Sequence, residues 1–110
     1  MSQLELSARA RQIAEELWTE YYQTVLITAR KAQKTWCSQI SLPDLLQEGF
    51  LCLLSVSGLS RTPGKFEATY EGPRGKAQFK TYFISALHNW YRDKGNEMKK
   101  ISQINYRRVR

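Results

Sequence analysis

Apolar residues recur at helical spacing along the first third of the chain. They stand three or four residues apart from residue 10 to residue 29, with no proline or glycine among them. A period near 3.6 residues gathers apolar side chains on one face of an α-helix. The pattern therefore predicts one long amphipathic helix from about Ser7 to Lys34. Its apolar face consists of Ala10, Ile13, Ala14, Leu17, Trp18, Tyr21, Tyr22, Val25 and Ala29.

A second helix is predicted after a connector over residues 34–40. Ser41 suits the N-cap position and Asp44 follows three residues later as its reciprocal partner. Pro43 is tolerated because amides in the first turn have no intrahelical acceptor. We expect the helix to run to about Ser55. Its core face is expected to consist of Leu42, Leu45, Leu46, Phe50, Leu53 and Leu54. Asp44, Gln47, Glu48 and Leu51 form an acidic, amide and apolar strip on another face, named the mixed strip below.

The helical pattern stops from Ser57 to Gln78, where Gly, Pro, Ser and Thr are frequent, so we expect a loop of about twenty residues. The third helix has the strongest pattern, with apolar residues at Phe79, Tyr82, Phe83, Ala86, Leu87, Trp90 and Tyr91. It is predicted to end near Lys94, with Gly95 as a left-handed cap. A short fourth helix is expected at Met98, Ile101 and Ile104, followed by a basic tail.

These elements predict an all-α fold. We expect one compact domain over residues 1–110, with three main helices, a short C-terminal helix and a long loop between the second and third main helices. Its core is expected at about 10–100 and its basic tail at about 101–110. The chain has 42% hydrophobic and 25% charged residues, values typical of a globular protein.

Positive charge changes the picture because it is unevenly placed. The net charge is +7, from 17 Lys and Arg against 10 Asp and Glu. Residues 1–55 hold five basic and six acidic residues, a net −1, and residues 56–110 hold twelve and four, a net +8. Such a basic half attracts polyanions such as nucleic acids. A solvated basic surface that serves solubility is the alternative.

Cysteine content and hydropathy indicate the compartment. Cys37 and Cys52 are too few for a disulfide scaffold and are interpreted as reduced thiols. No apolar run approaches the length of a membrane span, and the N-terminus lacks the pattern of a secretory signal. We therefore expect an intracellular, cytoplasmic protein.

Candidate catalytic chemistry is sparse. Gly58 and Gly64-Lys65 miss the spacing of a phosphate-binding loop, and Phe66 occupies the place of its Ser or Thr. His88 and the two cysteines do not have metal-site spacing. Glu15, Glu16 and Glu20 are interpreted as a solvated face. We expect no enzyme activity, no catalytic residue, no cofactor and no metal site.

Two surfaces instead suggest a binding protein. The mixed strip suits a basic protein partner. The basic half interleaves cations with aromatic rings, as single-stranded nucleic acid requires, because bases stack on rings and cations follow the phosphates. Burial of the third helix needs Phe79, Phe83, Leu87 and Trp90, which leaves Tyr70, Tyr82 and Tyr91 as candidate base platforms. The cations are Arg61, Lys65, Arg74, Lys76, Lys80, Arg92, Lys94, Lys99 and Lys100, and the rings are Phe66, Tyr70, Tyr82, Trp90 and Tyr91.

Several short motifs follow one another in a recognisable order along the chain. SLPDLLQEGFLCLLSV at 41–56 resembles the D-L-[IL]-Q-E-G-x-x-G-L hallmark of region 2.2 of bacterial sigma-70 class sigma factors. KFE at 65–67, RG at 74–75 and FKTY at 79–82 resemble the K-F-[DE], R-G and F-S-T-Y of that family. LHN at 87–89 with Asp93 is similar to A-R-N-x-x-x-D of the small extracytoplasmic-function branch. The resemblance covers about 17–100.

The resemblance implies a minimal transcription initiation factor, similar to phage late sigma-like factors or to a split sigma subunit. It also implies that the factor acts in the cytoplasm of a bacterial cell, or of an infected bacterial host if the chain is phage-encoded. It implies that Asp44, Gln47, Glu48 and Leu51 dock on the clamp coiled coil of the largest catalytic subunit of core RNA polymerase. It also implies recognition and melting of a minus-ten-like promoter element, with Tyr82 stacking where the first base pair opens. The residues expected to bind the non-template strand of this DNA are Lys65, Arg74, Lys76, Lys80, Tyr82, Asn89, Arg92, Lys99 and Lys100.

The chain departs from the family pattern in three respects. Ser85 and Ala86 stand where primary sigma factors have tandem tryptophans, and the connection between the second and third helices is longer. The resemblance stops about where region 3 would begin, so we expect no region 4, and a separate protein could supply upstream promoter recognition. Two alternatives are a clamp-binding regulator or inhibitor of the host polymerase without promoter specificity, and a generic helical nucleic-acid-binding module.

Overall fold

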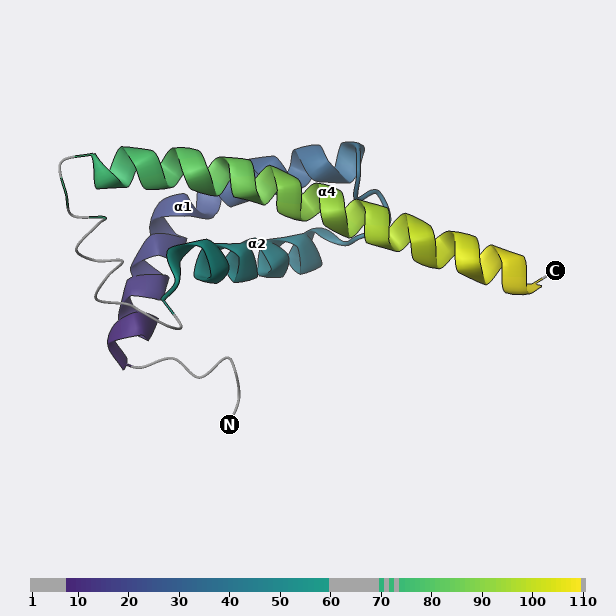
Figure 1. Ribbon diagram of the computed structural model, residues 1–110, viewed down its shortest axis with the longest axis horizontal. Coiled ribbons are helices and arrows are strands. Elements are labelled where there is room, and N and C mark those ends of the chain that lie inside the picture. The colour runs from purple at the N-terminus through teal and green to yellow at the C-terminus, as the bar shows by residue number, and fades with distance from the viewer. Residues whose placement is uncertain (1–7, 60–69, 71, 73, 110) are drawn as a thin grey trace.

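The described residues of the protein form a bundle of three helices (Figure 1). The computed structural model describes residues 8–59, 70, 72 and 74–109, with side chains as far as residue 100. The helices are α1 (Ala8–Lys34), α2 (Leu42–Ser57) and α4 (Gly75–Val109), and each packs against the other two. The described residues contain no strand, which confirms the all-α prediction. The C-terminal part of α4 extends past both other helices.

Capping residues define both ends of α2. Ser41 has an extended backbone and its Oγ accepts a hydrogen bond from the Asp44 amide at 3.3 Å, which confirms the predicted N-cap. At the other end Gly58 adopts a left-handed conformation, with φ 66°, and donates its amide to the Leu54 carbonyl at 3.2 Å. Glycine suits this cap because it has no Cβ to clash there. The helix consequently ends at Ser57, two residues later than predicted.

All three helices contribute to one core. Tyr21 and Val25 from α1 and Phe83 and Leu87 from α4 are buried together. The expected core face of α2 is confirmed, but its residues are buried to two different degrees. Leu45 and Leu53 are fully buried, whereas Leu42, Leu46, Phe50 and Leu54 pack against the core while partly buried. Both cysteines are free and buried, and burial raises the pKa of Cys52 to about 12.

Gly49 lies where α2 approaches the other two helices most closely. A Cβ at this position would collide with Cγ1 of Val25 and would lie 2.9 Å from the Tyr91 hydroxyl oxygen. That hydroxyl donates a hydrogen bond to the Leu45 carbonyl at 2.7 Å. Gly49 is therefore the residue that permits this close helix packing.

The predicted end of the third helix at Lys94 is wrong. The helix begins at Gly75, four residues before Phe79, and continues without interruption to Val109. Among the described residues only Gly58 has a positive φ, so Gly95 is an ordinary helical residue and does not cap the helix. Consequently there is no separate short fourth helix, and residues 101–109 of the expected tail continue α4.

Gly95 serves close packing instead. A Cβ there would collide with the Trp36 carbonyl oxygen and would lie 2.8 Å from Trp36 Cβ. The neighbouring Cys37 donates its thiol to the Tyr91 carbonyl at 3.2 Å. The connector between α1 and α2 therefore lies directly against the backbone of α4.

The residues of α4 that face its neighbours follow steps of four. They are Phe79, Phe83, Leu87, Tyr91 and Gly95. Four residues exceed one turn by about 40°, so this contact line rotates about 160° around α4 from its first member to its last. It begins against α1, where the Phe79 and Tyr21 ring centroids are 5.7 Å apart. It ends against the connector at Trp36.

Candidate nucleic-acid and protein interfaces

An exposed stripe runs along the outward side of α4. Its members alternate steps of four and three residues, a spacing that keeps side chains on one face of a helix. All are exposed, and Tyr82 is exposed by 61%, unusually for so large a ring. No member carries a carboxylate. The stripe, named the outer stripe below, consists of Gln78, Tyr82, Ser85, Asn89, Arg92, Asn96 and Lys99.

The outer stripe brings together four of the expected DNA-binding residues: Tyr82, Asn89, Arg92 and Lys99. The guanidinium of Arg92 donates a hydrogen bond to Asn89 Oδ1 at 2.7 Å. This bond limits the rotamers of both side chains before any ligand arrives. Lys100, also exposed, lies next to Lys99 in the same turn. A ring, a paired amide and guanidinium, and terminal cations are thus displayed on one rigid element.

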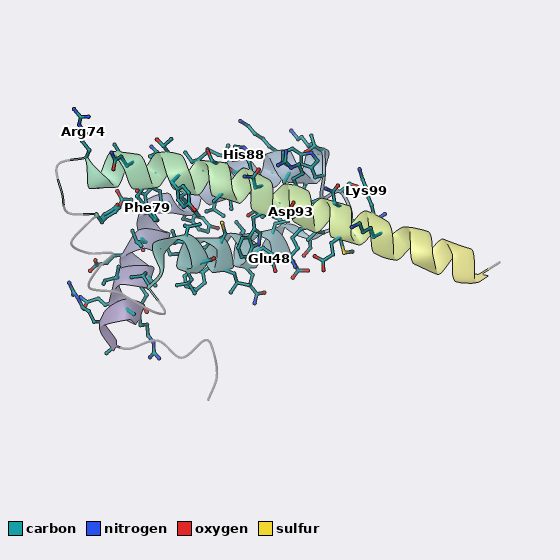
Figure 2. The ribbon with its side chains drawn as sticks, viewed as in Figure 1. Glu48, Arg74, Phe79, His88, Asp93 and Lys99 are labelled. Atoms are coloured by element: carbon teal, nitrogen blue, oxygen red, sulfur yellow. The ribbon has the colours of Figure 1, made fainter. Side chains whose placement is uncertain are left out.

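A broad hollow of about 590 Å³ lies beside the Tyr82 ring on the first turns of α4. Arg74, another expected DNA contact, is exposed at its edge and extends away from the three helices in Figure 2. A flat group lying in the hollow would contact both a ring and a cation. The described lining consists of Arg74, Ala77, Gln78, Thr81, Tyr82 and Ser85.

Lys76 and Lys80 are also exposed, but they lie toward α1. The ammonium of Lys76 forms an ion pair with Glu20 Oε1 at 2.6 Å. The hydrogen bond from Lys76 is the main cause of a lowered pKa of Glu20, and the charge of Lys80 contributes. The structure therefore separates these two expected DNA contacts from the outer stripe. It also gives Glu20, expected on a solvated face, two partners from outside α1.

The second partner of Glu20 is Tyr70, one of the candidate base platforms. Its hydroxyl donates to Glu20 Oε2 at 3.0 Å and lies 3.1 Å from the hydroxyl of Tyr21. Its ring packs edge-on against Phe79, with centroids 5.5 Å apart. Burial is the largest cause of its raised pKa. Tyr70 therefore anchors the chain before α4 against α1.

The prediction that Tyr91 is a base platform is wrong. Its side chain is fully buried, and its hydroxyl bonds the Leu45 carbonyl across the α2–α4 contact. Desolvation raises its pKa, as expected for a buried phenol. Of the three candidate rings, only that of Tyr82 is exposed enough to stack on a base.

The mixed strip on α2 divides into two parts. Asp44 and Gln47 are exposed and Leu51 is half-buried, an arrangement suited to a partner surface. Glu48 is instead held by α4. Its Oε1 accepts a hydrogen bond from the indole N–H of Trp90 at 2.8 Å and lies 3.7 Å from the Lys94 ammonium.

The sequence pattern did not predict the hydrogen bond between Glu48 and Trp90. A half-buried indole normally finds an acceptor for its N–H, so a tryptophan at the edge of an apolar face was the available signal. Lys94 extends the network, since its ammonium also lies 3.6 Å from Glu97 Oε2. Glu48 therefore has a structural role in joining α2 to α4, whatever else it contacts.

Some expected features lie outside the described residues. Lys65, Arg61 and Phe66 are among them. Within residues 8–59 and 74–100, no three His, Cys, Asp or Glu side chains could hold a metal ion together. No described helix is long and apolar enough to cross a bilayer.

The comparisons with known proteins leave the family open. Function must therefore be inferred from the residues of this chain and their geometry. No protein-family model, curated protein or solved structure gives a significant match to it.

Proposed function

We propose that this protein is a sigma-like transcription initiation factor. It binds core RNA polymerase through the clamp coiled coil and uses α4 to recognise and melt a minus-ten-like promoter element. The observation that carries the proposal is the presence of two chemically different surfaces on one three-helix core. The outer stripe of α4 carries the cations Arg92 and Lys99 and no carboxylate among its own members, whereas α2 exposes Asp44 and Gln47 beside Leu51. The order of the sigma-like motifs supports the same assignment.

On the nucleic-acid side, the exposed ring of Tyr82 supplies a stacking surface for a base that leaves the duplex. Flipping a base out of the duplex costs a few kcal/mol, and stacking on an aromatic ring returns about 1–3 kcal/mol. Arg92 and Lys99 provide phosphate contacts further along α4, and Asn89 provides an amide. These contacts hold the strand while the ring occupies the opened step.

On the protein side, Asp44 and Gln47 offer acceptors to arginine side chains of a coiled coil. Charge-assisted bonds of this kind are roughly twice as strong as neutral ones. Leu51 adds an apolar contact at the centre, in keeping with the apolar core and polar rim of protein interfaces. Glu48 supports the surface from below, because its bonds to Trp90 and Lys94 fix α2 against α4.

Charge reversal at Asp44 tests the docking surface. We expect Asp44→Lys to weaken binding to bacterial core RNA polymerase at least tenfold, because it places an ammonium among the arginines of the partner. Biolayer interferometry with immobilised core enzyme measures the change. Glu15→Lys is the matched control: it reverses one exposed carboxylate on α1, outside the mixed strip. Wild-type affinity of Asp44→Lys would contradict the docking assignment, as would equal losses in both variants.

Truncation of Tyr82 tests the melting role. We expect Tyr82→Ala to bind core polymerase normally and to form open complexes about tenfold less well on duplex promoters, because one stacking contact is lost. Permanganate footprinting measures the opening. A pre-melted template should restore activity, since it removes the step that the ring assists. Equal defects on duplex and pre-melted templates would assign Tyr82 another role. Reduced host transcription without new start sites would indicate an inhibitor instead.

A further inference from the structure

A second hollow lies where the connector between α1 and α2 meets α4. It encloses about 250 Å³. Its lining includes the buried residues Cys37 and Gly95 and three half-buried apolar side chains, Trp36, Ile40 and Met98. Exposed polar groups complete the lining, among them Ser38 and Lys99. Its volume is below the roughly 300–1,000 Å³ of sites for drug-sized ligands, so it suits a single ring.

The geometry of α4 leads the outer stripe into this hollow. The contact line rotates about 160° around the helix, whereas the stripe, with alternating steps of four and three, stays close to one face. With successive residues about 100° apart around the axis, Gln78 and Tyr82 lie about 60–100° from Phe79, whereas Lys99 lies only about 40° from Gly95. Lys99 belongs to both, as the last member of the stripe and as part of the lining of the hollow. A strand that follows the stripe away from Tyr82 reaches Trp36.

We propose that this hollow, named the Trp36 pocket, binds one unpaired base of a nucleic-acid strand lying along the outer stripe. Trp36 supplies the apolar ring surface for the base, and Ile40 and Met98 supply the apolar walls. Ser38 offers a hydroxyl to the polar edge of the base, and Lys99 pairs with the adjoining phosphate. None of the described lining residues is acidic, and Lys99 contributes a positive charge that favours a phosphate there.

The Trp36 pocket deepens the proposed function, because it rests on nucleic acid following the outer stripe. It adds a second base-binding position at the opposite end of that stripe from Tyr82. The two positions are seventeen residues apart on one helix when measured to Lys99, or about 26 Å along the axis. A strand held at both ends would be fixed in register as well as in position.

Binding of the isolated protein to fluorescein-labelled single-stranded dT12 tests the pocket by fluorescence anisotropy. We expect Trp36→Ala to weaken binding about tenfold and Trp36→Phe, which keeps a ring, to weaken it less than threefold. Ile27→Ala is the control, since it truncates an exposed apolar side chain on α1 that does not line the hollow. Binding to the corresponding dA·dT duplex should change less than twofold in Trp36→Ala, because a duplex offers no unpaired base.

Four results would overturn the proposal. The first is wild-type affinity of Trp36→Ala for dT12, and the second is an equal loss on the duplex, which indicates a structural role. A loss of polymerase binding alone would mean that the pocket accepts a protein side chain. If dTMP competed as well as unlabelled dT12 at the same concentration of nucleotide, the pocket would be a site for free nucleotides. Because this assay contains no polymerase, its outcome does not depend on the docking test. If Asp44→Lys left polymerase binding unchanged, the pocket proposal would stand, and failure of the pocket proposal would not contradict docking.

Discussion

Replacing Gly95 with valine should lower the free energy of unfolding by about 3 kcal/mol, because the new side chain meets backbone that cannot easily move. The first added atom would already collide with the Trp36 carbonyl oxygen. Valine gains a few tenths of a kcal/mol of helix propensity over glycine, far less than the steric cost. Thermal unfolding followed by circular dichroism should show a midpoint lower by about 10 °C or more.

Asn96→Val is the matched control for this prediction. It introduces the same β-branched side chain one position later on α4, where the side chain is exposed. Surface substitutions of this kind usually change stability by no more than about 0.5 kcal/mol. Equal midpoints for the two variants would show that the connector does not press on α4 at Gly95.

Replacing Glu48 with lysine should destabilise the fold by about 2–3 kcal/mol. The change removes the acceptor of the Trp90 indole N–H and brings a second ammonium close to Lys94. Loss of a hydrogen bond to a charged group costs about 1.5–3 kcal/mol, and repulsion between like charges adds to it. Urea denaturation followed by tryptophan fluorescence measures the loss, with Trp90 as a reporter at the affected contact.

Glu48→Gln separates the two contributions. Glutamine keeps an oxygen for the indole N–H and removes only the ion pair, so its loss should stay below about 1 kcal/mol. If glutamine and lysine were equally disruptive, the hydrogen bond would not be what matters. The role of Glu48 in the α2–α4 contact also bears on polymerase binding. Weaker polymerase binding by Glu48→Lys would reflect a loosened α2–α4 contact as well as any lost partner contact, which makes Asp44 the better probe.

Local patterns predicted the parts of the fold that local forces determine. The extent of α1 follows from apolar spacing alone, and the start of α2 follows from one serine whose side chain satisfies a nearby amide. The identity of Tyr82 as an exposed ring followed from the same reasoning, because the apolar face of α4 already had enough large residues for burial.

Contacts between distant residues were not readable in this way. Glycine ends helices in left-handed form and also permits close approach, so Gly95 alone could not show which use applied. The roles of Glu20 and Glu48 depend on Lys76 and Trp90, which lie 56 and 42 residues away. Burial of Tyr91 depends on a carbonyl of α2 as its acceptor, and no spacing along α4 indicates that partner.

The continuity of α4 has a mechanical consequence. Prolines and inserted turns are the usual hinges of long helices, and α4 contains no proline. Its softest residue, Gly95, is pressed by the connector and cannot flex freely. The helix therefore behaves as a stiff lever with Tyr82 near one end and Lys99 toward the other. In the proposed complex, a tilt imposed by a ligand at one of these positions also moves the other position, so the two ends of the bound strand are mechanically coupled.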